Sequence, residues 1–502
     1  MVRKSNKTRG QKLILNTITS LIYEVVTIVC GLILPRLIIG VYGSNVNGLV
    51  NSIAQFLQLV SFLDLGVGAV VQSALYKPLA EKDNSAVSNI ITSARKFFDK
   101  IAIILIIYVT IMICIYPFIA KHNFGWVYTA TLVAALSISY FAQYYFGVVD
   151  RLLLTANQEG YVQYTAQIIT LVLNTLACVF AIRNGASIQI VKLITSLIFL
   201  IRPVCLRIYV DRYYHINRAA KYTGEPIKQK WNGVMQHVSY VVLTSTDNIV
   251  LTLFSTFINV SIYSVYHMVI YGIKQLFISM TNGIRAIIGE LWAKNNIEKL
   301  KELFSITEWV IHIGVVFVYC CTWKLIIPFI NLYTNHVSDA DYIQPAFAVL
   351  LVLAHAVHCL RIPYNMLILA TGAYKEAQNM HIITAIINIV ISVAVVRSFG
   401  LIGVAVGTLA AMVYQTSWMV LFDSKNNICW PIKKVIRQIV FDMLCIAVIG
   451  TITHYIPSVV QSYLDWVILA IKEALISFLV VISMSLLFYR SQMRGFIRIF
   501  KR

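Results

Sequence analysis

Charged side chains stand inside the long apolar stretches of this sequence, and they give the first indication of chemistry. An ionised group near the centre of a lipid bilayer costs about 3 kcal/mol or more, so it usually faces a water-filled cavity or a partner. Such residues therefore mark either a place for a charged ligand or an internal ion pair. The residues of this kind are Glu24, Arg36, Asp64, Lys192, Asp247, Lys274, Arg285, Glu290, Lys324, Arg361, Lys472 and Glu473.

Position within the apolar runs sorts these groups by depth. Glu24 stands about eleven residues into the first run and Lys274 about fourteen into the eighth, and both positions are near the membrane midplane. Arg285 and Glu290 approach the end of that eighth run, where a long side chain can reach the membrane interface. Glu24 and Lys274 are therefore the strongest candidates for internal function.

The apolar runs themselves are the elements that must position these charges. The chain is 59% hydrophobic and 12% charged, which is typical of a polytopic membrane protein and leaves little room for a soluble domain. A helix needs about 20 apolar residues to cross the bilayer, and helices satisfy their own backbone hydrogen bonds in lipid. We therefore predict an all-α fold with about fourteen transmembrane helices. Their extents are 13–39, 46–76, 100–120, 126–150, 161–182, 187–206, 232–257, 260–291, 304–328, 342–370, 376–396, 400–422, 435–456 and 464–489.

The distribution of Lys and Arg sets the orientation. About 30 of the 41 lie at the two ends of the chain or in loops after even-numbered spans. Because positive residues stay in the cytoplasm, both termini are predicted to be cytoplasmic. The net charge of +20 follows from this topology. It favours anionic membrane lipids as neighbours and argues against nucleic acid as a partner.

A weak internal repeat runs through the chain at a lag of about 214 residues, typical of duplicated transporter halves. Ile168-Ile169-Thr170, Asn174 and Arg183 recur as Ile382-Ile383-Thr384, Asn388 and Arg397. The repeat predicts two six-helix lobes related by an axis along the membrane normal, with a pathway between them and two extra C-terminal helices. The predicted parts are an N-terminal lobe (1–206), a basic cytoplasmic connector (207–231), a C-terminal lobe (232–423) and the last two spans with a basic tail (424–502).

Several short motifs, in this order and at this spacing, resemble a known family. They are Val46–Val50, Leu63–Gly68, Thr246–Val250, Val260–Tyr266, Ala370–Lys375, Ala385–Ile389 and Gly400–Thr408. Together they resemble the Wzx-type polysaccharide flippases of the multidrug/oligosaccharidyl-lipid/polysaccharide export superfamily, over essentially the whole chain.

The resemblance implies a multi-pass protein of the bacterial inner membrane, without a cofactor. Its members move an undecaprenyl-pyrophosphate-linked oligosaccharide outward by alternating access, for the assembly of a surface polysaccharide such as O-antigen, capsule or exopolysaccharide. Polysaccharide polymerase and glycosyltransferases would then be partners.

The implied substrate gives the intramembrane cations a role. Two linked phosphates carry several negative charges, which Arg binds as a fork and Lys as a point charge. We expect four basic residues to line the cavity between the lobes and attract the pyrophosphate. They are Arg36, Lys192, Lys274 and Arg361. In the alternative interpretation, each of them neutralises a buried acid such as Glu24 or Asp247.

A second constellation resembles, in residue type and spacing, a sodium site of related lipid-linked flippases. Its members are Asp247, Asn388, Ser392, Val404 and Thr408. Ser392 departs from that pattern, because the related site has a second carboxylate there. Proton coupling through Asp247 or Glu24 is an alternative, and Asp64 is a further candidate for coupling. The remaining interpretation is a polar cluster that joins helices through hydrogen bonds.

Three rival functions remain open. A membrane enzyme that polymerises or ligates lipid-linked sugars needs a substantial extracytoplasmic loop with acid–base groups, whereas the longest such loop predicted here, 331–341, is short. His355 and His358 lack a third ligand for zinc. A cation-coupled multidrug exporter of the same superfamily would favour acidic cavity residues, whereas the intramembrane excess is basic. The third rival is a scaffold within a glycan-synthesis complex.

Overall fold

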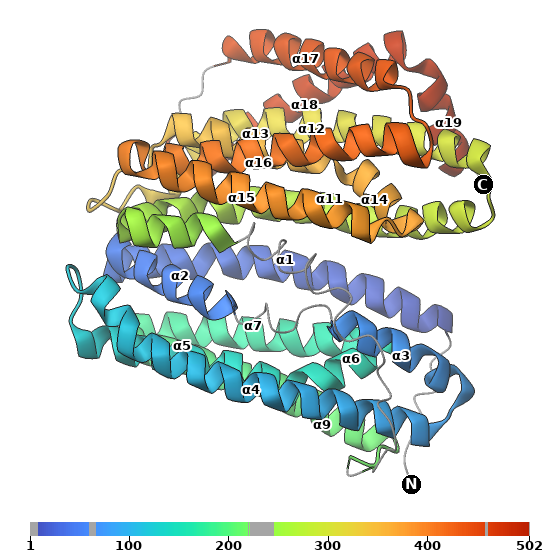
Figure 1. Ribbon diagram of the computed structural model, residues 1–502. Coiled ribbons are helices and arrows are strands. Elements are labelled where there is room, and N and C mark those ends of the chain that lie inside the picture. Colours follow the sequence, from blue (N-terminus) through green and yellow to red (C-terminus); the bar gives the residue numbers. More distant parts are fainter. Residues whose placement is uncertain (1–8, 60–66, 219, 221–244, 457–459, 501–502) are drawn as a thin grey trace. The chain divides into compact units, whose positions relative to one another are not determined.

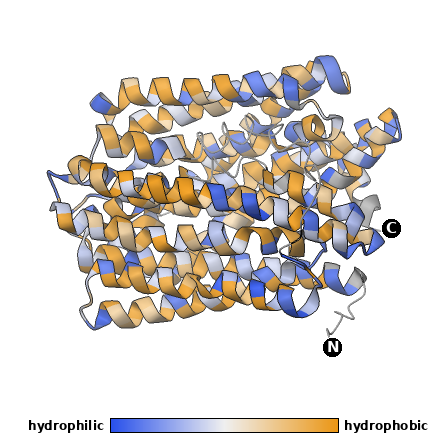
Figure 2. Cartoon of the chain, turned by 60° about the horizontal axis from the view of Figure 1, so that its bottom comes forward, coloured by the Kyte–Doolittle hydropathy of each residue, from blue (hydrophilic) through white to orange (hydrophobic). Residues whose placement is uncertain are grey.

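The computed structural model describes residues 9–59, 67–218, 220, 245–456 and 460–500, and most of them are helical (Figure 1). Contacts divide the chain into two compact units, Met1–Val241 and Val242–Arg502. In the described part of the chain, 11 helical segments are long and apolar enough to cross a membrane. Figure 2 shows hydrophobic residues along most helices and hydrophilic residues gathered toward their ends. The chain is thus an all-helical, multi-pass membrane protein, as predicted.

Unit 1 contains the first half of the spans. Its elements are α1 (Arg9–Tyr42), α2 (Ser44–Gln58), α3 (Val67–Glu81), α4 (Asn84–Ala120), α5 (Trp126–Ala142), the π-helical turn η2 (Gln143–Gly147), α6 (Val148–Ala156), α7 (Gly160–Arg183), α8 (Ile188–Phe199) and α9 (Ile201–Tyr213). Helix α1 packs against α7, and α4 packs against α5. The core of the unit joins α3, α4, α6 and α9 through buried aliphatic side chains such as Leu75, Leu153 and Val210.

Unit 2 begins, in the described residues, with a helical segment at 245–254. It continues with α11 (Phe257–Ala293), α12 (Ile297–Thr334), α13 (Pro345–Leu360), α14 (Ile362–Thr371), α15 (Tyr374–Phe399), α16 (Leu401–Phe422), the π-helical turn η3 (Asp423–Asn427), α17 (Ile432–His454), α18 (Tyr463–Phe488) and α19 (Arg490–Phe500). Helices α17 and α18 both pack against α12 (Figure 1). The predicted basic tail is helix α19, whose Phe496 contacts Trp309 of α12.

Several predicted spans differ in their limits from the observed helices. Helix α4 begins at Asn84, well before the predicted start at 100, and its N-cap Asp83 accepts bonds from the amides of Ser85 and Ala86. Span 187–206 is interrupted at Leu200 and span 342–370 at Arg361. Spans 46–76 and 232–257 include residues outside the described ranges, and α11 covers 260–291. The count of fourteen and the 207–231 connector therefore stay predictions.

The repeat expected from the sequence is visible in the helix boundaries. Helices α4, α6, α7 and α8 start at residues 84, 148, 160 and 188, and α12, α14, α15 and α16 start at 297, 362, 374 and 401. Packing repeats as well: α4–α5, α5–α8 and α7–α8 in unit 1 correspond to α12–α13, α13–α16 and α15–α16 in unit 2. Helices α17 to α19 have no counterpart among the helices described for unit 1.

Candidate functional site

Lys274 stands at the end of an aromatic stripe on α11. Tyr263, His267 and Tyr271 follow one another at intervals of four residues, so they share one face of the helix. The rings of Tyr263 and His267 are 5.3 Å apart, as are those of His267 and Tyr271. The Lys274 ammonium lies 4.4 Å from the centre of the Tyr271 ring. Lys274 is only 5% exposed, so this charge is held inside unit 2.

Arg361 approaches the same region from the junction of α13 and α14. It is the single residue between the two helices, and it is 9% exposed. One terminal guanidinium nitrogen lies 2.8 Å from Nδ1 of His358, and the other lies 3.5 Å from the sulfur of Met412. His355, one turn earlier on α13, meets His267 of α11 edge to face at 5.7 Å. We call Lys274, Arg361, His267, His355, His358 and Tyr271 the Lys274 cluster.

The electrostatics of the Lys274 cluster suit an anion. Lys274 and Arg361 lie close enough for their positive charges to repel each other. Both charges also interact electrostatically with the imidazoles of His355 and His358. Among the described residues, no carboxylate lies within salt-bridge distance of Lys274. Like charges in a buried region repel, so a bound anion would stabilise this arrangement.

The predicted cationic residues of unit 1 occupy two helices. Arg36 on α1 and Lys192 on α8 are both partly exposed. Lys192 acts electrostatically on the thiol of Cys178 in α7 and forms no ion pair with a described carboxylate. Glu24 is partly exposed on α1, and its carboxyl group interacts electrostatically with the hydroxyl of Tyr164 in α7. Because the two units are described separately, a cavity shared by Arg36, Lys192 and the Lys274 cluster stays a prediction.

The carboxylate of Asp247 is 3% exposed and is surrounded by neutral donors. The Tyr263 hydroxyl donates to Oδ2 at 2.8 Å, and the Thr408 hydroxyl lies 2.9 Å from Oδ1 and 2.8 Å from Oδ2. The Asn388 amide donates to Oδ1 at 3.4 Å and to the Thr408 hydroxyl at 3.1 Å. Four helical segments thus meet at one carboxylate. Sequence reasoning identified Asp247, Asn388 and Thr408 but missed Tyr263.

Ser392 and Val404 belong to the helix contact beside this carboxylate. Both are fully buried. Ser392 faces Gly407 of α16, while Val404 lies one turn before Thr408 on the same helix. The side-chain oxygens Asn388 Oδ1 and Ser392 Oγ have no hydrogen-bond partner among the described residues.

These contacts join four helical segments through hydrogen bonds, which fits the interpretation as a polar cluster between helices. The oxygens Asn388 Oδ1 and Ser392 Oγ remain as possible ligands of a cation. Sodium coupling and proton coupling through Asp247 therefore stay predictions. Asp64 lies outside the described residues, so the structure adds nothing on that candidate.

The sequence did not indicate a third polar cluster, which involves two residues of α12. Glu308 accepts hydrogen bonds from Tyr364 and from the indole of Trp430, the latter at 3.1 Å. His312 Nδ1 lies 2.6 Å from Asp442 Oδ2, which joins α12 to α17. Polar residues near the end of a predicted span resemble interfacial residues in a sequence, so only the helical spacing of four between Glu308 and His312 could have drawn attention to them.

Comparison with known proteins agrees with this architecture. No protein-family model matches the sequence, and no curated protein matches it. A structure of the lipid II flippase MurJ in an inward closed conformation superposes with a TM-score of 0.72 at 14% identity, covering 96% of this chain and 100% of that one.

Two other transporters are similar over slightly less of the chain. An inward-facing multidrug resistance MATE family transporter gives a TM-score of 0.61 at 16% identity, covering 80% of this chain and 94% of that one. A MOP superfamily transporter from Pyrococcus furiosus, described as having a binding pocket of reverse polarity, gives a TM-score of 0.54 at 15% identity. This match covers 82% of this chain and 96% of that one. The chain therefore has the all-helical fold of the MOP superfamily transporters.

Proposed function

We propose that this protein is a flippase that moves an undecaprenyl-pyrophosphate-linked oligosaccharide outward across the bacterial inner membrane, for the assembly of a surface polysaccharide. Alternating access between the two units would carry the headgroup past the bilayer core. Ion coupling through Asp247 would supply the direction of transport. A polysaccharide polymerase and glycosyltransferases are the proposed partners.

The observation that carries this proposal is the buried Lys274 cluster. Lys274 and Arg361 present two cationic side chains without a described carboxylate beside Lys274, which suits an acidic headgroup better than a cationic drug. The tyrosine and histidine rings around them offer flat surfaces on which a sugar ring can stack. The fold is shared with a lipid II flippase, which supports a lipid-linked substrate.

Reconstituted flipping tests the proposal directly. The full chain is placed in vesicles that contain a fluorescent polyprenyl-pyrophosphoryl sugar, and a membrane-impermeant quencher reports the fraction on the outer leaflet. We expect Lys274→Gln to lower the initial rate about tenfold, because a charge-assisted bond to the pyrophosphate is lost. Lys274→Arg, which keeps the charge, should retain most of the rate.

Lys294→Gln is the matched control. The Lys294 side chain is 66% exposed and pairs with Glu290 on the same helix, so removing it changes the net charge without touching the cluster. Its flipping rate should equal that of the parent. A Lys274→Gln variant that flips at the parental rate would remove the cluster from the mechanism. Vesicles with the parent protein that flip no faster than empty vesicles would remove the function.

A cation-coupled multidrug exporter is the second candidate, favoured by the likeness to MATE transporters and by the buried carboxylate of Asp247. It predicts efflux of a lipophilic cation that depends on Asp247 and improves when Lys274 is neutralised. The fluorescent-lipid vesicles, loaded instead with a cationic dye, separate the two candidates. A membrane enzyme would instead release or lengthen the sugar, which product analysis of the same vesicles detects.

A further inference from the structure

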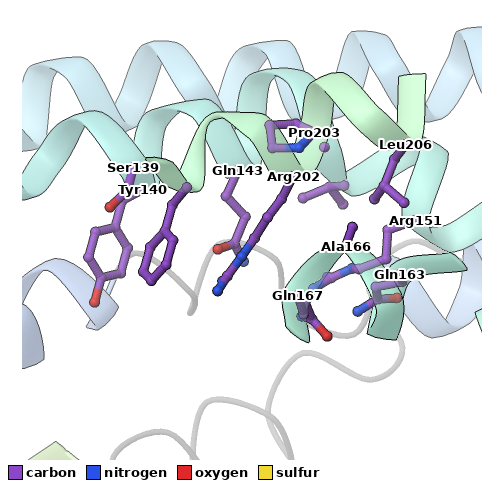
Figure 3. Close-up of a pocket in the computed structure, with 13 residues that line it drawn as sticks. Ser139, Tyr140, Gln143, Arg151, Gln163, Ala166, Gln167, Arg202, Pro203 and Leu206 are labelled. Atoms are coloured by element: carbon purple, nitrogen blue, oxygen red, sulfur yellow. The ribbon is translucent and has the colours of Figure 1, made fainter. Parts of the chain in front are cut away.

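Unit 1 contains a cavity of about 270 Å³ that the Lys274 cluster does not involve. It lies between the end of α5, η2, α6, α7, the end of α8 and α9, and Figure 3 shows the residues around it. In that view Gln143 and Arg202 point in the same direction, and Arg151, Gln163 and Gln167 gather toward the other end. Two arginines and three glutamines are a polar lining for a site within a membrane-spanning bundle.

Local backbone irregularities form the walls of this cavity. Helix α5 passes into the π-helical turn η2 at Gln143, and such turns within helices are frequent at functional sites. On the other side, the helix breaks at Leu200, and α9 starts afresh at Ile201. Gly147 allows the two to meet, because a β-carbon there would lie 3.1 Å from that of Pro203.

Two contacts hold Arg202 in place, and most of its N–H donors have no hydrogen-bond partner among the described residues. Its Nε donates to the Thr170 hydroxyl at 2.7 Å, and its guanidinium carbon lies 3.8 Å from the centre of the Phe199 ring. A guanidinium has five N–H donors, so the terminal nitrogens of Arg202 can still bind an anion as a fork. Among the described residues, neither Arg202 nor Arg151 has a carboxylate within salt-bridge distance.

The lining also requires a hydrogen-bond donor from a ligand. The side-chain oxygen of an amide accepts hydrogen bonds. In Gln167 this atom, Oε1, is buried and has no partner among the described residues. A hydroxyl group would satisfy it, while the guanidinium groups would bind a phosphate. The chemistry of the lining therefore fits a phosphate that carries a neighbouring hydroxyl group.

The surroundings of the cavity fit a ligand with an apolar tail. Phe146 in η2 and Ile201, Val204 and Ile208 in α9 are exposed, and in a membrane such side chains face lipid tails. A headgroup in the cavity would place its tail beside these residues. We propose that the Arg151–Arg202 cavity binds the phosphate-bearing, hydroxylated headgroup of an anionic lipid. This inference does not depend on the proposed flippase function.

Two lipids share this chemistry, and binding experiments distinguish them. The full chain is purified in nanodiscs of phosphatidylcholine, and the affinities for added phosphatidylglycerol and for an added farnesyl-pyrophosphoryl sugar are measured by native mass spectrometry. We expect Arg151→Gln with Arg202→Gln to weaken the preferred lipid about tenfold, because charge-assisted bonds to the phosphate are lost. Tighter binding of phosphatidylglycerol indicates a membrane lipid, and tighter binding of the farnesyl-pyrophosphoryl sugar indicates a polyprenyl-linked sugar.

The control removes the same two charges from the exposed arginines Arg183 and Arg212 of unit 1. This control should bind both lipids as the parent does, and the unfolding temperature should stay unchanged in both double variants. Arg202→Lys keeps the charge but not the fork, so it should give an intermediate affinity. Equal weakening in the control, or unchanged binding in the Arg151→Gln, Arg202→Gln variant, would overturn the proposal. Inorganic phosphate that binds as tightly as the lipids would also overturn it.

Discussion

The backbone nitrogen of Ser392 lies 2.9 Å from the position that a β-carbon on Gly407 would take. One turn away, a β-carbon on Gly403 would lie 2.7 Å from the carbonyl carbon of Val395. Helices α15 and α16 therefore touch backbone to backbone, as small residues four apart allow in membrane proteins. Because Asn388 and Thr408 flank this contact, the same glycines hold the donors of the Asp247 carboxylate in place.

Gly407→Ala should separate the two helices. Real β-carbons almost never approach other atoms this closely, so the helices must move apart, at a cost of about 1–3 kcal/mol. We expect the unfolding temperature in detergent to fall by several degrees. Gly450→Ala is the matched control, because a β-carbon on Gly450 of α17 meets nothing within 4 Å. An equal loss in both variants would contradict the close contact.

Thr408→Val should destabilise unit 2 while keeping the shape of the side chain. The Thr408 hydroxyl lies within hydrogen-bond distance of both oxygens of the Asp247 carboxylate, and a buried group left without its donor costs about 1–3 kcal/mol. The unfolding temperature reports the loss. Thr322→Val is the comparison, since its buried hydroxyl donates to the carbonyl of Val318 in its own helix. That change should have a clearly smaller effect.

The His312–Asp442 contact should be a strong tertiary interaction between α12 and α17. Both side chains are buried, and Gln438 also donates to the carboxylate, at 3.0 Å. A double-mutant cycle with His312→Asn and Asp442→Asn should give a coupling energy of about 1–3 kcal/mol, measured by unfolding. The exposed pair Lys77–Glu81, 3.8 Å apart, should give nearly zero in the same measurement. Equal couplings would contradict the importance of burial.

Apolar length and charge distribution were sufficient to predict the all-helical membrane fold. The repeat of about 214 residues was also within reach, because paired helices keep paired boundaries even where few residues match. The interruptions at Leu200 and Arg361 were not predicted, since an apolar window averages over a break that leaves composition unchanged. Arg361 stands at one interruption and Arg202 lies two residues after the other, so both basic regions lie beside geometry that the sequence did not predict.

The candidates around Asp247 were identified because their residue types and spacing resemble a sodium site of related lipid-linked flippases. Asn388, Val404 and Thr408 were identified in this way, and Asn388 and Thr408 meet the Asp247 carboxylate. The histidines beside Lys274 were not assigned to it, because α11 and α13 are far apart in sequence. Contacts of that kind depend on the packing angle of two helices, which a single sequence does not determine.

Asp247→Asn should abolish the response of flipping to an ion gradient. The introduced amide can still accept from Tyr263 and Thr408, so the hydrogen-bonded cluster is largely kept, while the negative charge that a cation or proton would bind is lost. In reconstituted vesicles, the parent should flip faster when either a sodium gradient or a proton gradient is imposed. The Asp247→Asn variant should flip at the rate measured without either gradient.

The responses to the two gradients identify the coupled ion. The unfolding temperature of Asp247→Asn shows whether this carboxylate has only a structural role. Asp339→Asn, which removes a carboxylate from the loop after α12, should keep the parental response to both gradients. An Asp247→Asn variant that responds as the parent does, but unfolds at a lower temperature, would show that this carboxylate only joins helices. Loss of the sodium response alone would identify sodium as the ion that is coupled through Asp247, and loss of the proton response alone would identify the proton.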